Sequence, residues 1–273
     1  MHLRLATWNI NSVRLRIDLV ARFLSEEAPD VLCLQEIKCR DSEFPLSAFH
    51  KLGYPHVVVN GQKGHHGVAI ASRIPLRLLE RRSFCEKDDA RHIAVELASN
   101  GGRRGIALHN FYVPAGGDEP DPVINPKFAH KLAFLDEMAR WVDSEEIAKT
   151  DAIMTGDLNI APLETDVWNH KALLRVVSHT PIEVEKLNFL RESGPWVDAL
   201  RHFVAPEERL YTWWSYRARD WEKSDRGRRL DHIWVSESLK PSLDSARVFR
   251  ASRGWDRPSD HVPAVVDFRL PCF

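Results

Sequence analysis

The sequence has few cysteines, no long apolar run and almost no net charge, and each shortage excludes a class of protein. Its four cysteines among 273 residues are scattered, and no two have the spacing of a zinc or redox motif. We expect them to be buried small side chains or surface thiols. They are Cys33, Cys39, Cys85 and Cys272. No apolar run is long enough to span a membrane and the N-terminus lacks a signal-peptide pattern, so we expect no membrane contact and a cytoplasmic location.

The near balance of charge limits how the chain could bind a polyanion. It has 38 Lys and Arg residues and 39 Asp and Glu residues, a formal net charge of −1. No global field therefore attracts nucleic acid, and such a partner would need a local basic patch or a metal ion. One basic patch is segment 217–229, with six Arg or Lys residues and three acidic ones. Trp213, Trp214 and Trp221 lie in it or just before it.

Strand-like segments dominate the chain. With 273 residues, 44% of them hydrophobic, it can bury about three quarters of its unfolded surface, so we expect a single domain over 1–273. Short β-branched or alternating runs recur between turn signals. These runs are 3–9, 30–36, 56–60, 67–72, 92–99, 105–113, 151–159, 230–236 and 262–270.

Amphipathic helices are predicted between some of the strands, at 14–27 and 127–143. Their apolar faces carry Leu15, Leu19 and Phe23 in the first helix, and Phe128, Leu132, Leu135 and Met138 in the second. Strands outnumber helices, and some come in hairpin-like pairs such as "VVVNGQKGHHGVAIA". This pattern favours an α/β sandwich of mixed sheets over a strictly alternating parallel sheet.

Polar residues collect where the predicted strands end. In "LRLATWNIN", Asn9 shares the parity of Leu3 and Leu5, so it would lie at the end of the core-facing side. The alternative for Asn9 is a turn-forming role. Glu36 ends the apolar run "DVLCLQE", where a buried carboxylate needs a partner or a cation; the alternative is a solvent-facing strand end.

The segment "AIMTGDLNIAP" carries two polar side chains with a shared direction. Asp157 and Asn159 are two residues apart, so they point the same way from one strand, and Gly156 leaves room for close approach. A carboxylate and an amide that face one point suit activation of water and contact with phosphate oxygens. Taken alone, the same letters could form a turn.

An acid and an imidazole stand side by side in "RPSDHVPA". Pro258 and Pro263 hold Asp260 and His261 in or beside a turn, where both can reach one cavity. Sequence neighbours cannot easily form the orienting bond between ring and carboxylate, so His261 needs another acid, and Asp231 in "RRLDHIW" can supply it. A capped turn with a surface histidine is the alternative.

Nine blocks in order now resemble one protein family. They are "TWNINS", "LQEIK", "GQKGHHGVAI", "NFYVPAG", "GDLNIAP", "WVDALR", "YTWWSYR", "RLDHIWVS" and "PSDHVP". They are similar to blocks of the exonuclease III family of apurinic/apyrimidinic endonucleases, within the endonuclease/exonuclease/phosphatase superfamily. The resemblance implies a four-layer α/β sandwich of two face-to-face mixed sheets with helices outside. It also implies a Mg²⁺- or Mn²⁺-dependent phosphodiesterase that acts on duplex DNA.

The resemblance also implies roles for residues of this chain. Glu36 matches the principal metal ligand, and His261, oriented by Asp231, matches the imidazole that contacts a phosphate oxygen. The catalytic set implied is Tyr112, Asp157, Asn159, Asp231 and His261. The ligand set for one or two ions is Asn9, Glu36, Asp157, Asn159, Asp260 and His261. The general base stays open among Asp157, Asp231 and His261.

DNA contacts are implied less specifically. The segment "NGQKGHHG" and Arg91 resemble parts that grip the DNA backbone without reading its sequence, although a glycine-rich hairpin turn would look the same. The backbone candidates are Asn60, Lys63, His65 and Arg91. Trp213 and Leu230 resemble walls of the pocket for a baseless sugar, with a core position as the alternative for Trp213.

Two departures from the family pattern concern that pocket. Arg228 stands where many relatives have a third apolar wall, and we expect it to contact DNA. His179 stands where relatives tend to have Phe. Both changes could favour processing of damaged 3′ ends over incision 5′ to abasic sites, so we leave the order of these activities open. We expect a monomer, associated with the nucleoid if the source is bacterial.

Two other functions remain possible on the sequence. One is a phosphodiesterase or phosphatase for lipid headgroups, inositol phosphates or undamaged DNA, in which a His usually replaces Tyr112. The other is an inactive DNA-binding or scaffold protein, which would often lack a ligand or the His, whereas every catalytic position here is filled.

Overall fold

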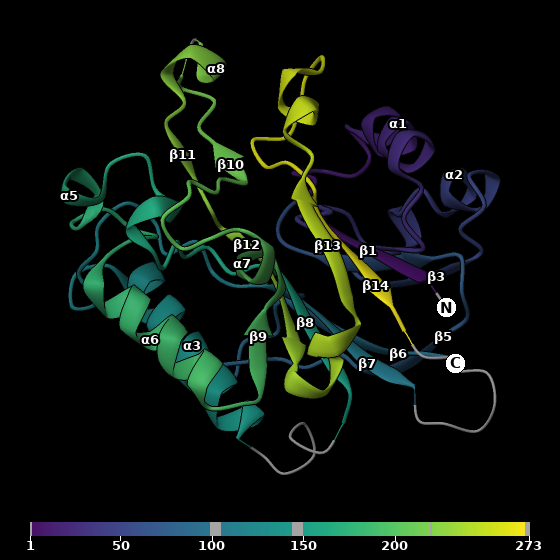
Figure 1. Ribbon diagram of the computed structural model, residues 1–273, viewed down its shortest axis with the longest axis horizontal. Coiled ribbons are helices and arrows are strands. Elements are labelled where there is room, and N and C mark those ends of the chain that lie inside the picture. The colour runs from purple at the N-terminus through teal and green to yellow at the C-terminus, as the bar shows by residue number, and fades with distance from the viewer. Residues whose placement is uncertain (1, 99–104, 144–149, 219, 271–273) are drawn as a thin grey trace.

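Two six-stranded sheets lie face to face, with helices on both outer sides (Figure 1). The computed structural model describes residues 2–98, 105–143, 150–218 and 220–270. Cys272, Ser99 at the end of the predicted strand 92–99, and Arg219 in the basic segment lie outside the described residues. The predicted class, an α/β sandwich of mixed sheets with outer helices, is confirmed.

The first sheet has the order β13-β14-β1-β2-β4-β3, and the second has the order β5-β6-β7-β8-β12-β9. In the first, only β1 and β2 are parallel, and in the second only β7 and β8 are. The first sheet's strands are β1 (His2–Asn9), β2 (Val31–Gln35), β3 (His56–Asn60), β4 (Val68–Ser72), β13 (Leu243–Val248) and β14 (Ala264–Arg269). The second sheet's are β5 (Leu76–Glu80), β6 (His92–Leu97), β7 (Ile106–Tyr112), β8 (Ala152–Asp157), β9 (Trp196–Asp198) and β12 (Asp231–Ser236).

Helices and a small hairpin complete the chain. The helices are α1 (Ile17–Glu27), α2 (Leu46–Lys51), α3 (Pro126–Val142), α5 (His170–Leu173), α6 (Pro181–Glu192), α7 (Ala199–Phe203) and α8 (Trp221–Ser224). Short 3₁₀ turns are η1 (Asp41–Glu43), η2 (Glu164–Asp166), η3 (Glu237–Ser242) and η4 (Arg250–Gly254). Strands β10 (Trp213–Trp214) and β11 (Gly227–Arg228) form a hairpin that projects with α8 from one end of the molecule (Figure 1).

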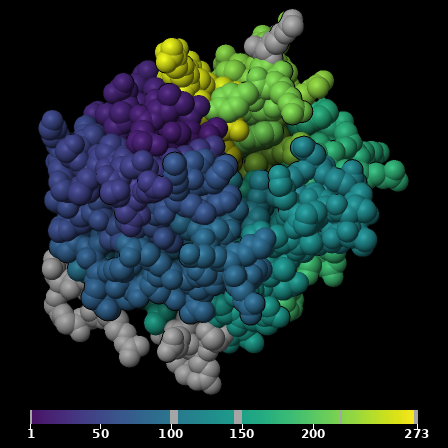
Figure 2. Space-filling view, turned by 180° about the vertical axis from the view of Figure 1, so that it is seen from behind, coloured from purple at the N-terminus to yellow at the C-terminus, as the bar shows by residue number. Residues whose placement is uncertain are grey.

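The side-chain alternation of β1 explains the layers. Leu3 and Leu5 belong to the core between the two sheets, whereas Ala6 and Trp8 pack under α1 and α2, because successive side chains of a strand point to opposite faces. The outer face of the second sheet packs against α3 and α6. Seen from behind, the first hundred residues cover one side of the molecule, and teal and green segments of the middle of the chain cover the other (Figure 2).

Most predicted elements occur with ends shifted by a few residues, but one helix start was wrong. The helix expected from residue 14 begins at Ile17, and Leu15 is 62% exposed instead of packing on the core. Strands β5, β9 and β13 were missed because they are short or lack an apolar alternation. Among the described residues, no helix is long and apolar enough to cross a membrane.

A buried ion pair joins α3 to α6 behind the second sheet. Lys131 and Glu183 are both fully buried and in contact, and the Lys131 ammonium also donates to the Asn159 carbonyl at 2.8 Å. Glu183 in turn accepts the backbone N–H of Ser178 at 2.9 Å. Burial lowers the pKa of Lys131, although Glu183 opposes that change. The pair therefore ties two helices to the turn that carries Asn159.

We predict that Lys131→Met lowers the free energy of unfolding by about 3–5 kcal/mol, because it leaves the buried Glu183 carboxylate without a compensating positive charge. Lys186→Met is the matched control: it breaks the half-exposed Lys186–Asp136 pair between the same two helices, worth at most about 1 kcal/mol. Urea denaturation of both variants measures the difference. Equal losses would show that the buried pair has no special weight.

Candidate active site

The candidate active site lies at the end of the sandwich where both parallel strand pairs finish. β1 and β2 end at Asn9 and Gln35, and β7 and β8 end at Tyr112 and Asp157. The carboxyl ends of parallel strands share one edge of a sheet. Asp231 lies at the same edge, because it starts β12 and pairs in register with Asp157. A cavity of about 670 Å³ opens there.

His261 lies between two buried carboxylates. Its Nδ1 donates to Asp231 Oδ2 at 2.8 Å, and its Nε2 is 3.7 Å from Asp157 Oδ2. Asp231 is fully buried, and its other oxygen, Oδ1, is buried with no hydrogen-bond partner among the described residues. The bond from Nδ1 fixes the orientation of the ring, so Nε2 faces Asp157 and the cavity.

The two carboxylates control the charge of this imidazole. Burial alone would lower the pKa of His261, but the negative charges of Asp231 and Asp157 outweigh it, so the pKa is raised above its ordinary value. The pKa of Asp157 is also raised, mainly by burial and further by Asp231, with the charge of His261 opposing it. The arrangement therefore favours a protonated His261 beside a carboxyl group that can exchange a proton.

Asp157 is also held by two amide side chains. Its Oδ1 accepts the backbone N–H of Asn159 at 2.9 Å, while its Oδ2 accepts Nδ2 of Asn9 at 2.8 Å and Nδ2 of Asn159 at 3.2 Å. Asn159 has a left-handed backbone (φ 55°). Such strain in a non-glycine residue is common at functional sites. It brings both ends of Asn159 onto the same carboxylate.

Glu36 lines the cavity and shares the side-chain amide of Asn9 with Asp157. Its Oε1 accepts hydrogen bonds from Asn9 Nδ2 and from the Tyr112 hydroxyl, both at 2.9 Å, and its Oε2 is 2.8 Å from Lys38 Nζ. Burial alone would raise the pKa of Glu36, but Lys38 and Asn9 lower it below its ordinary value. Burial and the charges of Glu36 and Asp157 raise the pKa of Tyr112, so its hydroxyl stays a donor.

Oxygen atoms around Lys38 fit a cation site. Its ammonium contacts Glu36 Oε2 and also Asn11 Oδ1, at 2.6 Å. Asn11 Nδ2 in turn contacts Asp260 Oδ1 at 3.2 Å. Carboxylate and amide oxygens are the ligands that Mg²⁺ prefers, and in this structure the Lys38 ammonium contacts two of them. A second group that could hold a metal is Asp157, Asp231 and His261, whose ligand atoms lie within 4.8 Å of one another.

A polar network between the sheets supports the site from below. Gln35 Nε2 donates to Thr7 Oγ1 at 2.8 Å and to Asn110 Oδ1 at 2.7 Å. Asn110 Nδ2 donates to the carbonyls of Leu34 and Ala69, both at 3.0 Å. Gln35, Thr7 and Asn110 are fully buried. This network joins the two sheets directly beneath Asn9 and Glu36, and so fixes their separation.

The structure separates the residues expected to grip the DNA backbone into two kinds. Lys63 and His65 are exposed on the loop between β3 and β4. Asn60 donates its side-chain amide to the His92 carbonyl at 2.9 Å. Arg91 is only 6% exposed and contacts Asp89 and the Tyr112 carbonyl. These contacts of Asn60 and Arg91 are internal to the protein, and those of Arg91 support Tyr112.

The walls of the cavity include all three residues expected at the sugar pocket. Trp213, Arg228 and Leu230 line it, together with Glu36, Tyr112, Asn159, Asp260 and His261. Trp213 Nε1 donates to Asp260 Oδ2 at 3.0 Å. His179, the second departure from the family pattern, does not itself line the cavity, although its neighbour Ser178 does. Instead, the Nδ1 of His179 donates to the Ala161 carbonyl, and its Nε2 accepts from His170.

Four residues that contact the predicted site residues were not predicted from the sequence. Lys38 and Asn11 stand two residues after Glu36 and Asn9, and their presence in the blocks "LQEIK" and "TWNINS" was the available signal. Ser259 donates to the Asn9 carbonyl at 2.6 Å. His66 lies 3.1 Å from Arg91 and tilts toward the Tyr112 ring, whereas its predicted neighbour His65 is exposed.

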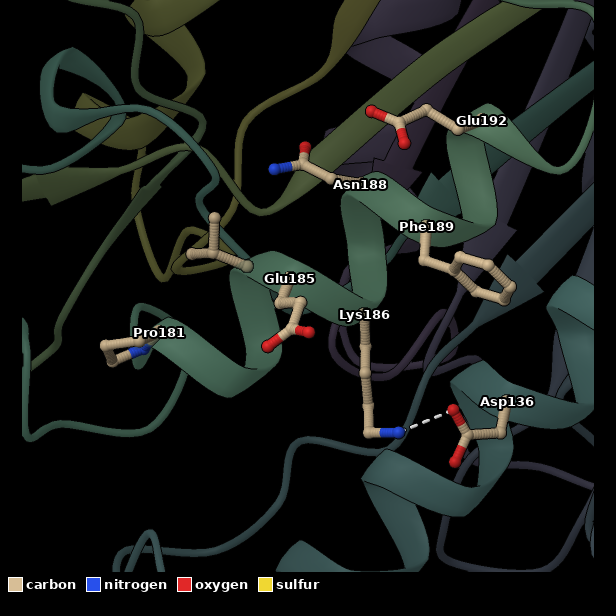
Figure 3. Close-up of a pocket in the computed structure, with 8 residues that line it drawn as sticks. Asp136, Pro181, Glu185, Lys186, Asn188, Phe189 and Glu192 are labelled. Atoms are coloured by element: carbon tan, nitrogen blue, oxygen red, sulfur yellow. Dashed lines mark hydrogen bonds and ion pairs between the residues drawn. The ribbon is translucent and has the colours of Figure 1, made fainter.

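Another hollow, of about 680 Å³, lies on the outer helices and shares no lining residue with the strand-end cavity (Figure 3). It is formed by α6 and by Asp136 of α3, and the Lys186–Asp136 ion pair crosses it. Phe189 is 59% exposed beside it. None of the predicted catalytic or metal-binding residues lines this hollow, so the strand-end cavity is the candidate active site.

Comparison with known proteins identifies the family. The model of the Endonuclease/Exonuclease/phosphatase family matches residues 6–261, which span both sheets and the strand-end cavity. The fold and this match define a member of that family. Within it, the chain belongs to the exonuclease III family of apurinic/apyrimidinic endonucleases, and it is a hydrolytic nuclease.

Three relatives illustrate the similarity. Exodeoxyribonuclease III of Haemophilus influenzae is 29% identical, and the match covers 98% of this chain and 100% of the relative. An AP endonuclease from Archaeoglobus fulgidus superposes with a TM-score of 0.89 at 33% identity, over 98% of this chain and 100% of that structure. The 3′ phosphatase NExo from Neisseria, bound to a product DNA hairpin, has a TM-score of 0.86 at 29% identity, over 98% and 100%.

We predict that Asp231→Asn lowers the pKa of His261, because the substitution removes the negative charge that most stabilises the imidazolium. NMR titration of the metal-free protein with labelled histidine measures it. His179, whose nitrogens are bonded elsewhere, is the internal control and should titrate unchanged. An unshifted His261 would mean that Asp231 does not set its charge.

Proposed function

We propose that the protein is a Mg²⁺- or Mn²⁺-dependent DNA-repair phosphodiesterase that hydrolyses one ester bond by in-line attack of water. The observation that carries the proposal is the convergence of Glu36, Asn159 and His261, from three distant parts of the chain, on one cavity, with Asp157 in contact with Asn159 and close to His261. An in-line attack adds negative charge to the non-bridging phosphate oxygens, which fixed donors and positive charges stabilise.

The geometry favours Asp157 for proton transfer with the attacking water or the departing oxygen. His261 is held in its charged form between two carboxylates, so it is a poor proton acceptor. Asp231 lies behind the ring and already accepts its Nδ1–H. Asp157 has a raised pKa and contacts Asn159. A group whose pKa lies near the operating pH is suited to general acid–base work.

The remaining residues hold the phosphate in place. We assign to the protonated Nε2 of His261, the amide of Asn159 and the hydroxyl of Tyr112 the contacts to phosphate oxygens. Glu36 and Asp260, with the amide oxygens of Asn9 and Asn11, would hold a divalent ion, and Asp157, Asn159 and His261 remain ligands if there are two. When bound, the ion would supply positive charge beside the phosphate and acidify a water molecule.

Duplex DNA with abasic sites or damaged 3′ ends is the proposed substrate. The names of the relatives span the expected activities: an exodeoxyribonuclease III, an AP endonuclease and a 3′ phosphatase bound to DNA. The exposed Lys63 and the cavity-lining Arg217 and Arg226 supply positive groups for the DNA backbone, and the exposed His65 lies on the same loop as Lys63. A monomer, organised as one domain and located with the DNA in the cytoplasm, stays part of the proposal.

We predict that Asp157→Asn lowers kcat on duplex DNA with an abasic analogue or a 3′-phosphate by roughly 10²–10⁴-fold, because it removes the proton-transfer group. The asparagine is nearly isosteric, so DNA affinity should change little. Gel assays of cleavage and anisotropy measurements of binding test both parts. Exposed Glu222→Gln is the matched control. Full activity of Asp157→Asn would contradict this role, and a wild type inactive on both substrates would contradict the proposed function.

We predict that EDTA abolishes cleavage, that Mg²⁺ or Mn²⁺ restores it, and that Glu36→Gln needs at least tenfold more metal for half-maximal rate. The substitution removes the negative charge with which Glu36 would hold a hard cation. Metal titrations of the cleavage rate measure the shift. An unchanged metal requirement in Glu36→Gln would show that Glu36 is not a principal ligand.

A further inference from the structure

Arg228 lines the candidate catalytic cavity and lies close to His261 across neighbouring strands. In the small hairpin Arg228 pairs in register with Trp213, and Trp213 forms a bridge with His261. All three side chains line the same cavity. One strand, that of Trp213, therefore separates Arg228 from His261, and both side chains line the same cavity.

Only part of the Arg228 guanidinium forms hydrogen bonds within the described residues. Its Nη1 donates to the Val177 carbonyl at 2.9 Å and to Ser178 Oγ at 2.7 Å, and its carbon lies 5.2 Å from the centre of the Trp213 ring. Its Nε is buried and has no hydrogen-bond partner among the described residues. These contacts hold Nη1, and among the described residues no partner bonds Nε or Nη2.

The next residue along the chain shows what a fully paired arginine looks like in this fold. Arg229 bonds Asp166 at 2.8 and 3.0 Å and Asp198 at 2.7 Å. Among the described residues, no carboxylate forms an ion pair with Arg228. Burial lowers the pKa of Arg228, and only Glu183 opposes this from a distance.

An unpaired cation beside apolar walls indicates a missing anion. Trp168, Val176 and Leu230 line the same cavity, and an apolar surrounding destabilises a charge that has no partner. A guanidinium with a free Nε edge matches a carboxylate or phosphate, which it can bind through two parallel hydrogen bonds. The apolar walls leave space for a small group and do not compete for that edge.

We propose that Arg228 binds a negatively charged ester arm that remains on the scissile phosphorus, and so directs the enzyme to 3′ ends blocked by small anionic groups such as phosphoglycolate. The inference rests on the proposed function. Water adds to phosphorus and the bond from phosphorus to the DNA 3′-oxygen breaks. The 3′-oxygen takes a proton to become a hydroxyl, and phosphoglycolate leaves with the added OH. Arg228 contacts the carboxylate throughout and takes no part in bond breaking.

The experiment compares two duplexes that differ only in the charge of the arm. One 3′ end carries phosphoglycolate and the other carries 2-hydroxyethyl phosphate, a neutral arm of the same length. We expect kcat/KM of the wild type to favour the charged arm by roughly ten- to a hundredfold, as charge-assisted hydrogen bonds allow. In Arg228→Leu this ratio should fall to about one. Arg228→Lys keeps the charge but loses the paired donors of the guanidinium, so its ratio should lie between those of the wild type and Arg228→Leu.

Arg175→Leu is the matched control, because Arg175 is exposed and lies outside the cavity lining. It removes the same charge from the protein and should leave the ratio as in the wild type. If Arg228→Leu unfolds, which its melting curve reports, Arg228→Lys still tests the proposal. A ratio unchanged in Arg228→Leu and Arg228→Lys overturns it, and so does a wild-type ratio near one both here and with the charged abasic arm.

Further substrates show whether a phosphate can replace the carboxylate, and whether a negative result concerns Arg228 alone or the proposed function. A 3′-terminal abasic unit with or without its own 3′-phosphate tests phosphate in place of carboxylate. A preference for either charged arm that depends on Arg228 supports the proposal, and the absence of both overturns it. A plain 3′-phosphate serves as the activity check. If the wild type processes it with Mg²⁺ but shows no dependence on Arg228, only the Arg228 proposal fails.

Discussion

Two buried carboxylates share one imidazole, and the rest of the site depends on this arrangement. Asp231 orients His261 from behind, while Asp157 faces its other nitrogen. At a site this buried, two ionised carboxylates would be unfavourable without a positive charge between them. The imidazolium compensates one of them and leaves the other, Asp157, with a raised pKa. In the proposed mechanism, the same three side chains therefore supply positive charge for phosphate binding and a proton carrier for hydrolysis.

The sandwich makes this arrangement possible because it brings strand ends from both sheets together. Much of this could be predicted from the sequence, since parity along β1 and β8 decides where Asn9 and Asp157 point, and the prolines around His261 indicate a turn. Asp231 was predicted to orient His261, because the imidazole needs an acid other than its sequence neighbour and Asp231 starts another apolar strand. In the structure the two side chains form a 2.8 Å hydrogen bond.

Other features could not be predicted from the sequence, for physical reasons. The edge strands β5 and β13 are half exposed, so they lack the apolar alternation that marks a strand. Whether Arg91 contacts DNA or the protein depends on tertiary packing, which buries it under Tyr112. The difference between Arg228 and Arg229 is likewise invisible in "GRRL", because the carboxylates that pair with Arg229 come from distant segments.

The central claim is that Asp157 and His261 act as one unit on one phosphate, and a double-mutant cycle tests it most directly. Asp157→Asn, His261→Gln and the double variant would be compared by kcat/KM on one duplex with an abasic analogue. Residues that act as a unit show strongly non-additive effects. The account predicts a double variant about as slow as the slower single variant. Losses that simply multiply would contradict it, because they would mean that the two side chains act independently.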